Sequence, residues 1–311
     1  MSGGGDVLAV EAVRAVAIDV EAAAPLQSSP SSQRPPLPPP SPSPSPAHAQ
    51  TACPSSASSV SVSASASVSA SASLRTPRPI LLTIPAADGA TPLYCAVFLP
   101  DAAIWGPGPF PTVVSVYGGP HVQRVKADWI TTAEPRAQEL RRAGFLVVAA
   151  DGRGSARRGL KFESEIFHKM GSVEVDDQVA VVKALVGWGV ADPASVGIYG
   201  WSYGGYMSLL CLAKHPDVFH AAVSGAPVTE WESYDTGYTE RYMGTPAENP
   251  EGYAAASVLT HAAGIKGRLL IVHGMLDENV LPRHSMRLIG ALTAANVHCK
   301  LGWGAKRPVA R

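Results

Sequence analysis

The sequence has few cysteines, no cluster of basic residues and no long apolar run. Its 311 residues include four cysteines (Cys53, Cys95, Cys211 and Cys299), scattered without metal-site or disulfide spacing. The 25 basic and 25 acidic residues balance, and no basic cluster offers a footprint for nucleic acid. No apolar run approaches the roughly 18 residues of a membrane-spanning helix. These absences favour a reducing compartment and predict no metal, no cofactor, and neither nucleic acid nor membrane as a partner.

The N-terminus lacks the pattern of a signal peptide. Residues 1–21 carry four acidic residues and one arginine, without a continuous apolar core. Residues 22–87 contain no acid and much serine, as organelle transit peptides do, but the acidic start argues against plastid or mitochondrial targeting. We expect a cytoplasmic protein.

Composition divides the chain into three parts. Residues 25–79 are proline, serine and alanine almost throughout, and such a segment cannot bury enough apolar surface to offset chain entropy. We therefore predict a disordered leader over residues 1–79. Residues 80–301 have the composition of one globular domain, and residues 302–311 form a divergent tail.

Beyond residue 79, strand patterns alternate with helix patterns. Residues 80–84 and 93–99 are separated by a glycine-containing turn, which predicts a hairpin. Helix patterns cover Pro135 to Arg142 and the stretch in which Val175, Val179, Val182 and Leu185 fall at helical spacing behind an acidic first turn. This alternation predicts an α/β fold with a doubly wound, mostly parallel sheet. The continuous apolar runs that read as buried strands are residues 112–117, 145–150, 196–199, 221–224 and 269–273.

The segment Gly200-Trp201-Ser202-Tyr203-Gly204 is the most informative motif. It follows the apolar run 196–199 and precedes the helix-forming run 207–214. Strand, G-x-S-x-G turn and helix are the context of a nucleophile elbow, in which a strained serine projects from the turn. The helix N-terminus then directs free N–H groups at negative charge developing on a substrate. The pattern predicts that Ser202 is a nucleophile of an α/β-hydrolase fold.

A serine hydroxyl needs a base and an acid that orients the base. In α/β-hydrolases the three residues follow the chain order Ser, Asp, His. Asp277 comes after the apolar run 269–273 and after Ser202, so it is the candidate acid. Tyr117 also follows a predicted strand, and strand ends meet at one edge of such a sheet.

Several longer motifs carry a family resemblance. Four of them are Tyr117-Gly118-Gly119-Pro120, Asp151-Gly152-Arg153-Gly154-Ser155, residues 200–206 and residues 273–280. These four resemble the signature of the prolyl oligopeptidase family. Three further stretches, residues 158–163, 174–178 and 234–244, resemble the dipeptidyl peptidase 4 branch of that family, most closely dipeptidyl peptidases 8 and 9. The motifs stand in the family's order, and the resemblance runs from about Ile80 to Leu301.

The resemblance implies a role for each matching residue. Ser202 would be the acylated nucleophile of a serine peptidase, and Asp277 the acid. The backbone N–H of Tyr203 and the hydroxyl of Tyr117 would bind the oxyanion. The resemblance also implies peptide substrates and a homodimer. A pocket for proline, or another small residue before the scissile bond, would be lined by Val228, Trp231, Tyr234, Tyr238, Asn279 and Val280.

The sequence departs from the family in two ways. The family places a β-propeller before the hydrolase domain, and no propeller sequence precedes Ile80 here. The family also places its catalytic histidine about 32 residues after the acid, whereas residues 302–311 contain no histidine. His298 precedes the expected position, and we expect it not to reach Ser202. We therefore expect the sheet to lack its last strand and the helix after it.

These observations leave more than one functional hypothesis. The leading one is a post-proline serine peptidase domain that is inactive as the chain stands, because losing a triad histidine costs on the order of 10⁶ in turnover. A second is a general esterase-like hydrolase with a substitute base. A third is a non-catalytic protein, either a pseudoenzyme serving as an interaction module or a truncated gene product. Arg153 with Asp176 and Asp177 is interpreted as a structural ion pair, and the other histidines as surface or core residues.

Overall fold

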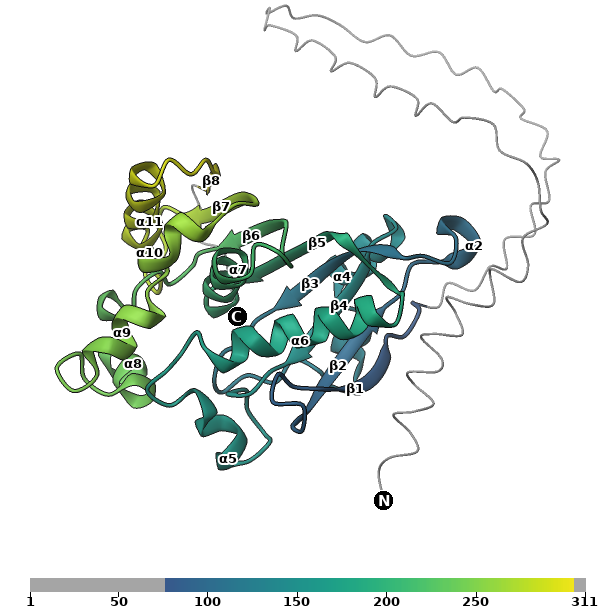
Figure 1. Ribbon diagram of the computed structural model, residues 1–311, viewed down its shortest axis with the longest axis horizontal. Coiled ribbons are helices and arrows are strands. Elements are labelled where there is room, and N and C mark those ends of the chain that lie inside the picture. The colour runs from purple at the N-terminus through teal and green to yellow at the C-terminus, as the bar shows by residue number, and fades with distance from the viewer. Residues whose placement is uncertain (1–75, 305–311) are drawn as a thin grey trace, which may run out of the picture. The chain divides into compact units, whose positions relative to one another are not determined.

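A computed structural model of the protein describes residues 76–304. Nearly all of the predicted leader, and residues 305–311 of the tail, lie outside these residues. The described chain forms one eight-stranded sheet with helices packed against it (Figure 1). Within this range no helix is both long enough and apolar enough to cross a membrane.

The sheet is mostly parallel, as the sequence predicts. Its strand order is β1-β2-β4-β3-β5-β6-β7-β8, with β1, β2 and β4 paired antiparallel and every later pair parallel. The predicted hairpin is β1 with β2. The strands are β1 (Ile80–Pro85), β2 (Pro92–Phe98), β3 (Phe110–Val116), β4 (Leu146–Asp151), β5 (Ala191–Trp201), β6 (Ala221–Gly225), β7 (Arg268–Gly274) and β8 (Lys300–Gly304).

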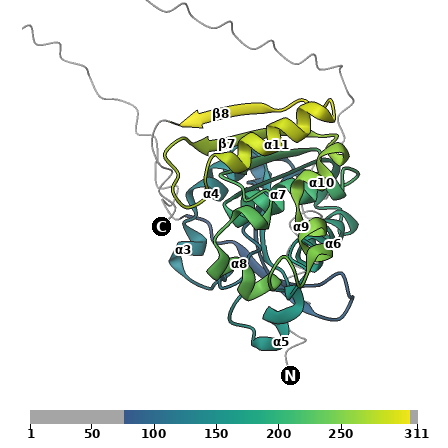
Figure 2. The ribbon, with the colours of Figure 1, turned by 90° about the vertical axis from the view of Figure 1, so that its left-hand side faces the viewer.

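Helices cover both faces of the sheet (Figure 2). Alternate residues of β4 show this division: Val147 and Ala149 pack in a small apolar cluster with α4, whereas Leu146 and Val148 belong to the large core that includes α6 and α7. The helices are α2 (Ala102–Trp105), α3 (Trp129–Thr132), α4 (Pro135–Arg142), α5 (Leu160–Glu163), η1 (Ser164–Ile166), α6 (Val173–Gly187), α7 (Tyr203–Lys214), η2 (Trp231–Ser233), α8 (Thr236–Met243), α9 (Pro250–Ala256), α10 (Val258–His261), η3 (Ala262–Gly264) and α11 (Arg283–Ala294).

The expectation that the last strand is missing is wrong. Lys300–Gly304 forms β8 and pairs in parallel with β7 from Leu270↔Lys300 to Gly274↔Gly304. The backbone N–H of Met275 also donates to the carbonyl of Gly304 (2.9 Å). Two glycines make this segment a weak strand former by itself, and pairing with β7 supplies the ladder that local propensity does not. The predicted domain boundary at Leu301 therefore falls inside a strand, and the residues after Gly304 lie outside the described range.

Candidate active site

The predicted elbow forms the junction between β5 and α7. Ser202 has φ 57° and ψ −116°, a positive-φ backbone conformation that residues other than glycine rarely adopt. Its N–H donates to the carbonyl of Gly225 on the neighbouring strand β6 (2.8 Å). A Cβ at Gly200 would lie 2.3 Å from the carbonyl oxygen of Gly204, and one at Gly204 would lie 2.3 Å from that of Val116. The two glycines are thus required by close backbone approach, and the strained serine agrees with the prediction.

The sheet topology brings the site segments together. Strands β3, β5, β6 and β7 are neighbours in that order and all run parallel. Tyr117 directly follows β3, Ser202 directly follows β5, and Asp277 comes three residues after β7 ends at Gly274. The carboxyl ends of these strands share one edge, which is where open α/β sheets place their ligand sites.

A cavity of about 180 Å³ opens at this edge. It contains the nucleophile candidate, both oxyanion candidates and most of the predicted substrate pocket, but Asp277 and Val280 are not among its lining residues. Val280 is buried beside the pocket. The lining residues are Tyr117, His121, Ser202, Tyr203, Val228, Trp231, Tyr234, Tyr238 and Asn279.

Aromatic rings form the pocket wall. The rings of Trp231 and Tyr238 are nearly parallel (19°) with centroids 6.0 Å apart. Tyr234 meets both edge-on, at 5.9 Å and 5.5 Å, and its hydroxyl donates to Oδ1 of Asn279 (3.2 Å). Burial raises the pKa of Tyr234 and of Tyr238, so both phenols stay neutral. Such flat, uncharged walls suit a compact apolar ring.

Helix α11 holds the segment that carries Trp231. The Nδ1 atom of His284 accepts from the N–H of Thr229 (3.2 Å), and the guanidinium of Arg283 donates to the carbonyl of Ser233 (2.7 Å). His284 is 1% exposed, and burial lowers its pKa to about 4. A neutral imidazole is the form that can accept this backbone hydrogen bond, so His284 supports the pocket wall without entering the pocket.

The two residues of the predicted oxyanion site pack against each other. The Tyr117 and Tyr203 ring centroids are 6.1 Å apart. As the first residue of α7, Tyr203 has a backbone N–H without a partner four residues earlier in the helix. Burial of Tyr117 raises its pKa to about 12, which keeps its hydroxyl protonated and able to donate at neutral pH.

Asp277 is fixed by the turn that follows β7. Its Oδ1 accepts from the N–H groups of Asn279 and Val280, both at 3.0 Å. The nearest imidazole is that of His273, whose Nε2 is 3.9 Å from Oδ2. That Nε2 lies 2.7 Å from the carbonyl oxygen of Val280, so it carries the proton, and Nδ1 lies 2.7 Å from the hydroxyl of Ser285. Both nitrogens of His273 are therefore engaged in the core.

The structure adds one residue that the sequence analysis placed among surface or core histidines. His121 lines the pocket and its ring meets Tyr238 edge-on at 5.7 Å. Partial burial, with Arg241 nearby, lowers its pKa. The available signal was its position four residues after Tyr117, in the same loop. His298, in contrast, is exposed between α11 and β8.

The predicted structural ion pair forms with one of its two candidate acids. The guanidinium of Arg153 contacts Asp177 through Nη2–Oδ1 (2.8 Å) and Nε–Oδ2 (3.0 Å). It also reaches Asp88 in the β1–β2 turn (3.3 Å). Asp176 instead lies 3.5 Å from Nε2 of His215. The pair fastens the β4–α5 loop to α6 and takes no part in chemistry.

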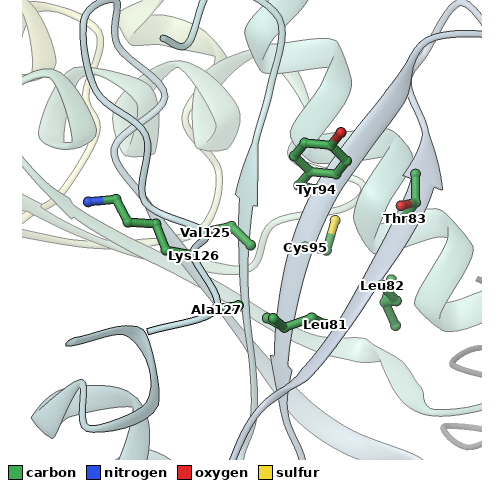
Figure 3. Close-up of a pocket in the computed structure, with 8 residues that line it drawn as sticks. All are labelled: Leu81, Leu82, Thr83, Tyr94, Cys95, Val125, Lys126 and Ala127. Carbon is green, nitrogen blue, oxygen red and sulfur yellow. The ribbon is translucent and has the colours of Figure 1, made fainter. Parts of the chain in front are cut away.

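A second hollow, of about 270 Å³, lies along β1 and β2 (Figure 3). Its residues come from those two strands and from the loop before α3, and they include Lys126, Tyr94 and the buried thiol of Cys95. Burial raises the pKa of that thiol well above its usual range, so it stays protonated and unreactive. The hollow is larger than the Ser202 pocket, but only the latter combines a nucleophile with oxyanion donors.

Together, the sheet order and the strained serine after β5 define an α/β-hydrolase with a serine nucleophile elbow. The family model described as "Prolyl oligopeptidase family" matches residues 132–305, more than half of the chain. The chain belongs to the prolyl oligopeptidase family of serine peptidases.

Its relatives are longer proteins. Human dipeptidyl peptidase 8 is 47% identical over 190 residues, which are 60% of this chain and 21% of that protein. Human prolyl endopeptidase FAP is 35% identical over 201 residues, or 62% of this chain and 26% of the relative. The crystal structure of Porphyromonas gingivalis dipeptidyl peptidase 4 superposes with a TM-score of 0.65 at 33% identity, covering 74% of this chain and 33% of that one. The chain thus spans about a fifth to a quarter of the curated relatives it matches.

Proposed function

We propose that residues 80–304 are a serine peptidase catalytic domain whose site is built to cleave after proline or another small residue. The observation that carries the proposal is the shared pocket: Ser202 lies in one cavity with Tyr117 and the aromatic wall of Trp231, Tyr234 and Tyr238. The names of the relatives, dipeptidyl peptidase and prolyl endopeptidase, support the same substrate class.

The pocket residues suggest how the reaction would proceed. The ring of the residue before the scissile bond would enter the cavity and pack against the aromatic wall of Trp231, Tyr234 and Tyr238. Oγ of Ser202 would attack the carbonyl carbon and give up its proton, while the Tyr203 N–H and the Tyr117 hydroxyl would hold the oxyanion. Collapse would release the amine as it takes a proton and leave an acyl group on Ser202, which water then hydrolyses.

Both proton transfers need a base. His273 has both nitrogens engaged, His284 is bonded to Thr229, and His298 is exposed. His121 lines the Ser202 pocket, but its ring packs on Tyr238, and within residues 76–304 it has no hydrogen bond to Ser202 or Asp277. No described histidine therefore forms the pairing with both Asp277 and Ser202 that a triad requires. Asp277 accepts two N–H groups on Oδ1, which leaves Oδ2 as the oxygen to orient an imidazole. We therefore propose that Ser202 is reactive toward strong electrophiles, whereas turnover of peptides is close to nil in this chain.

Labelling and turnover together test the proposal. A fluorophosphonate should modify Ser202 in the native chain and fail to modify Ser202→Ala. Ser195→Ala is the matched control, because Ser195 lies exposed near the opposite end of the same strand β5. Hydrolysis of an Xaa-Pro amide should be barely measurable and should rise when free imidazole is added.

Two results would contradict the proposed function. Rapid turnover without imidazole that Ser202→Ala abolishes would show that a substitute base exists, as in the esterase-like alternative. A folded native chain that is not labelled even when free imidazole is added would show that Ser202 is not a nucleophile. That result would favour the non-catalytic alternative, an interaction module.

A further inference from the structure

Glu174 is a carboxylate that the catalytic proposal leaves unused. It lies in the first turn of α6, and its exposed fraction is 0%. Burying a carboxylate is costly unless hydrogen-bond donors replace water. Three donors do so: the N–H of Gly171, the N–H of Ser172 (3.0 Å) and the hydroxyl of Tyr203 (2.9 Å). A group surrounded in this way acts as an acceptor.

The third donor links Glu174 to the elbow. Tyr203 directly follows Ser202 and opens α7, so the same residue supplies an oxyanion N–H and a side chain bonded to α6. The Tyr203 ring is also packed against both sides of the pocket. Its centroid is 6.1 Å from that of Tyr117 and 5.4 Å from that of Trp231. A ring fixed at its hydroxyl end and packed on two neighbours has little freedom to tilt, and neither has the backbone that carries it.

The segment that holds Glu174 is itself pressed against α7. Gly171 has φ 78°, and a Cβ there would lie 2.2 Å from the hydroxyl oxygen of Tyr206. The ammonium of Lys214, at the end of α7, donates to the Gly171 carbonyl (2.7 Å). On the other side, the N–H of His168 donates to the carbonyl of Tyr242 in α8 (2.7 Å). Glu174 is therefore held by contacts to α7 at both ends of that helix.

From these contacts we infer that Glu174 is a positioning residue, which fixes the Tyr203 ring through its hydroxyl and thereby aims the Tyr203 N–H at the oxyanion. This rests on the proposed function, because it assumes that Ser202 is the nucleophile. The inference separates two effects. Loss of the Glu174–Tyr203 bond should slow the chemical step on Ser202, whereas the cavity lined by Trp231, Tyr234 and Tyr238 should bind as before.

The test compares fluorophosphonate labelling of two test variants, their double variant and two controls with that of the native chain, over a range of probe concentrations. Glu174→Met keeps about the length of the side chain but removes both acceptor oxygens, so the Tyr203 hydroxyl loses its partner. A glutamine would not ensure this loss, because Oε1 accepts from both Gly171 and Tyr203 and an amide oxygen can take its place. Tyr203→Phe removes only the hydroxyl. Tyr206→Phe is the matched control, since that hydroxyl is equally buried and donates to the Ala256 carbonyl instead (2.9 Å). Glu139→Gln controls for loss of charge at an exposed site.

In Glu174→Met and Tyr203→Phe we expect the limiting labelling rate to fall about tenfold or more, with the half-saturating probe concentration unchanged within about twofold. The double variant should be no slower than the slower single one, because both changes remove one interaction. Both controls should label at the native rate. Native limiting rates in the two test variants, or effects that multiply in the double variant, would overturn the inference.

A crystal structure of Glu174→Met separates this inference from the proposed function. If the native chain itself is not labelled, the proposed function fails, yet the position of Tyr203 can still be compared. A displaced Tyr203 ring and N–H would support the positioning role of Glu174. A Tyr203 that keeps its native position would overturn it, whatever the labelling shows.

Discussion

Nε2 of His273 lies 3.9 Å from Oδ2 of Asp277, too far for a hydrogen bond, while the same nitrogen lies 2.7 Å from the carbonyl oxygen of Val280. The histidine nearest to the candidate acid is thus a structural residue that ties β7 to the turn after it. Its other nitrogen faces Ser285 at the start of α11. Asp277 therefore lies in a turn suited to a catalytic acid, but the histidine nearest to it is held by other partners and does not complete a triad.

We predict that His273→Asn lowers the free energy of unfolding by roughly 1–3 kcal/mol, because it leaves buried partners without hydrogen bonds. Fluorophosphonate labelling of Ser202 should stay within about twofold of native at temperatures where the variant is folded. Urea unfolding and labelling rates measure the two effects. His298→Asn, at an exposed site, should change neither. A folded His273→Asn that no longer labels would identify His273 as the base.

The close approach at the elbow predicts opposite results for two helical glycines. Gly204→Ala should cost more than about 4 kcal/mol or prevent folding, because its Cβ would lie 2.3 Å from the Val116 carbonyl oxygen. Gly290→Ala in α11 should stabilise the protein by about 0.5–1 kcal/mol, because nothing lies within 4 Å of its Cβ and alanine is the better helix former. Thermal and urea unfolding compare them. Equal changes in the free energy of unfolding for the two variants would contradict the close packing of β5 against α7 at the elbow.

Tyr117→Phe tests the side-chain half of the oxyanion site. We expect its limiting labelling rate to fall about 10²-fold, the scale of losing one oxyanion donor. The pKa of Tyr117 is raised to about 12, so the native chain should show no loss of labelling near pH 10 from ionisation of this phenol. Tyr94→Phe, at the hollow on β1 and β2 shown in Figure 3, is the matched control. An unchanged rate in Tyr117→Phe would remove this residue from the oxyanion site.

The buried imidazole of His284 predicts a dependence of stability on pH. Its folded pKa is about 4, whereas the unfolded value is near 6.5, so between these pH values the unfolded chain binds more protons. Stability from this residue is therefore complete above about pH 6.5 and is lost as pH falls toward 4, by roughly 2–3 kcal/mol.

Urea unfolding at pH 7 and pH 4.5 measures the effect. His284→Asn offers a side-chain oxygen to the Thr229 N–H but does not titrate, so its stability should fall less between the two pH values than that of the native chain. An identical fall in the free energy of unfolding between pH 7 and pH 4.5 in both proteins would show that His284 does not contribute to the pH dependence of stability.

Most of the fold could be predicted because its determinants are local or periodic. Five apolar runs located strands β3 to β7 to within a few residues, although β5 extends to both sides of its predicted core. Strand β8 was missed because Gly302 and Gly304 hide its pattern, and only the exposed edge of β7 makes it a strand. The expected homodimer and cytoplasmic location stay predictions.

The residues of the candidate site likewise include some that the sequence predicted and some that it did not. Ser202, Tyr117 and the aromatic residues from Trp231 to Tyr238 were found from motifs, and one pocket contains them. His121 and Glu174 were not assigned to the site, because nothing in their local sequence indicates a contact with Tyr238 or Tyr203.

The sequence alone determined the elbow, since a strained serine needs glycines at fixed neighbouring positions, and it determined the sheet, since buried parallel strands need continuous apolar runs. The tertiary structure alone decided how the buried polar groups are paired. Glu174 bonds to Tyr203, 29 residues away, and His273 bonds to the core rather than to Asp277. Such pairings depend on how packed elements exclude water around a polar group, and that environment exists only once the chain has folded.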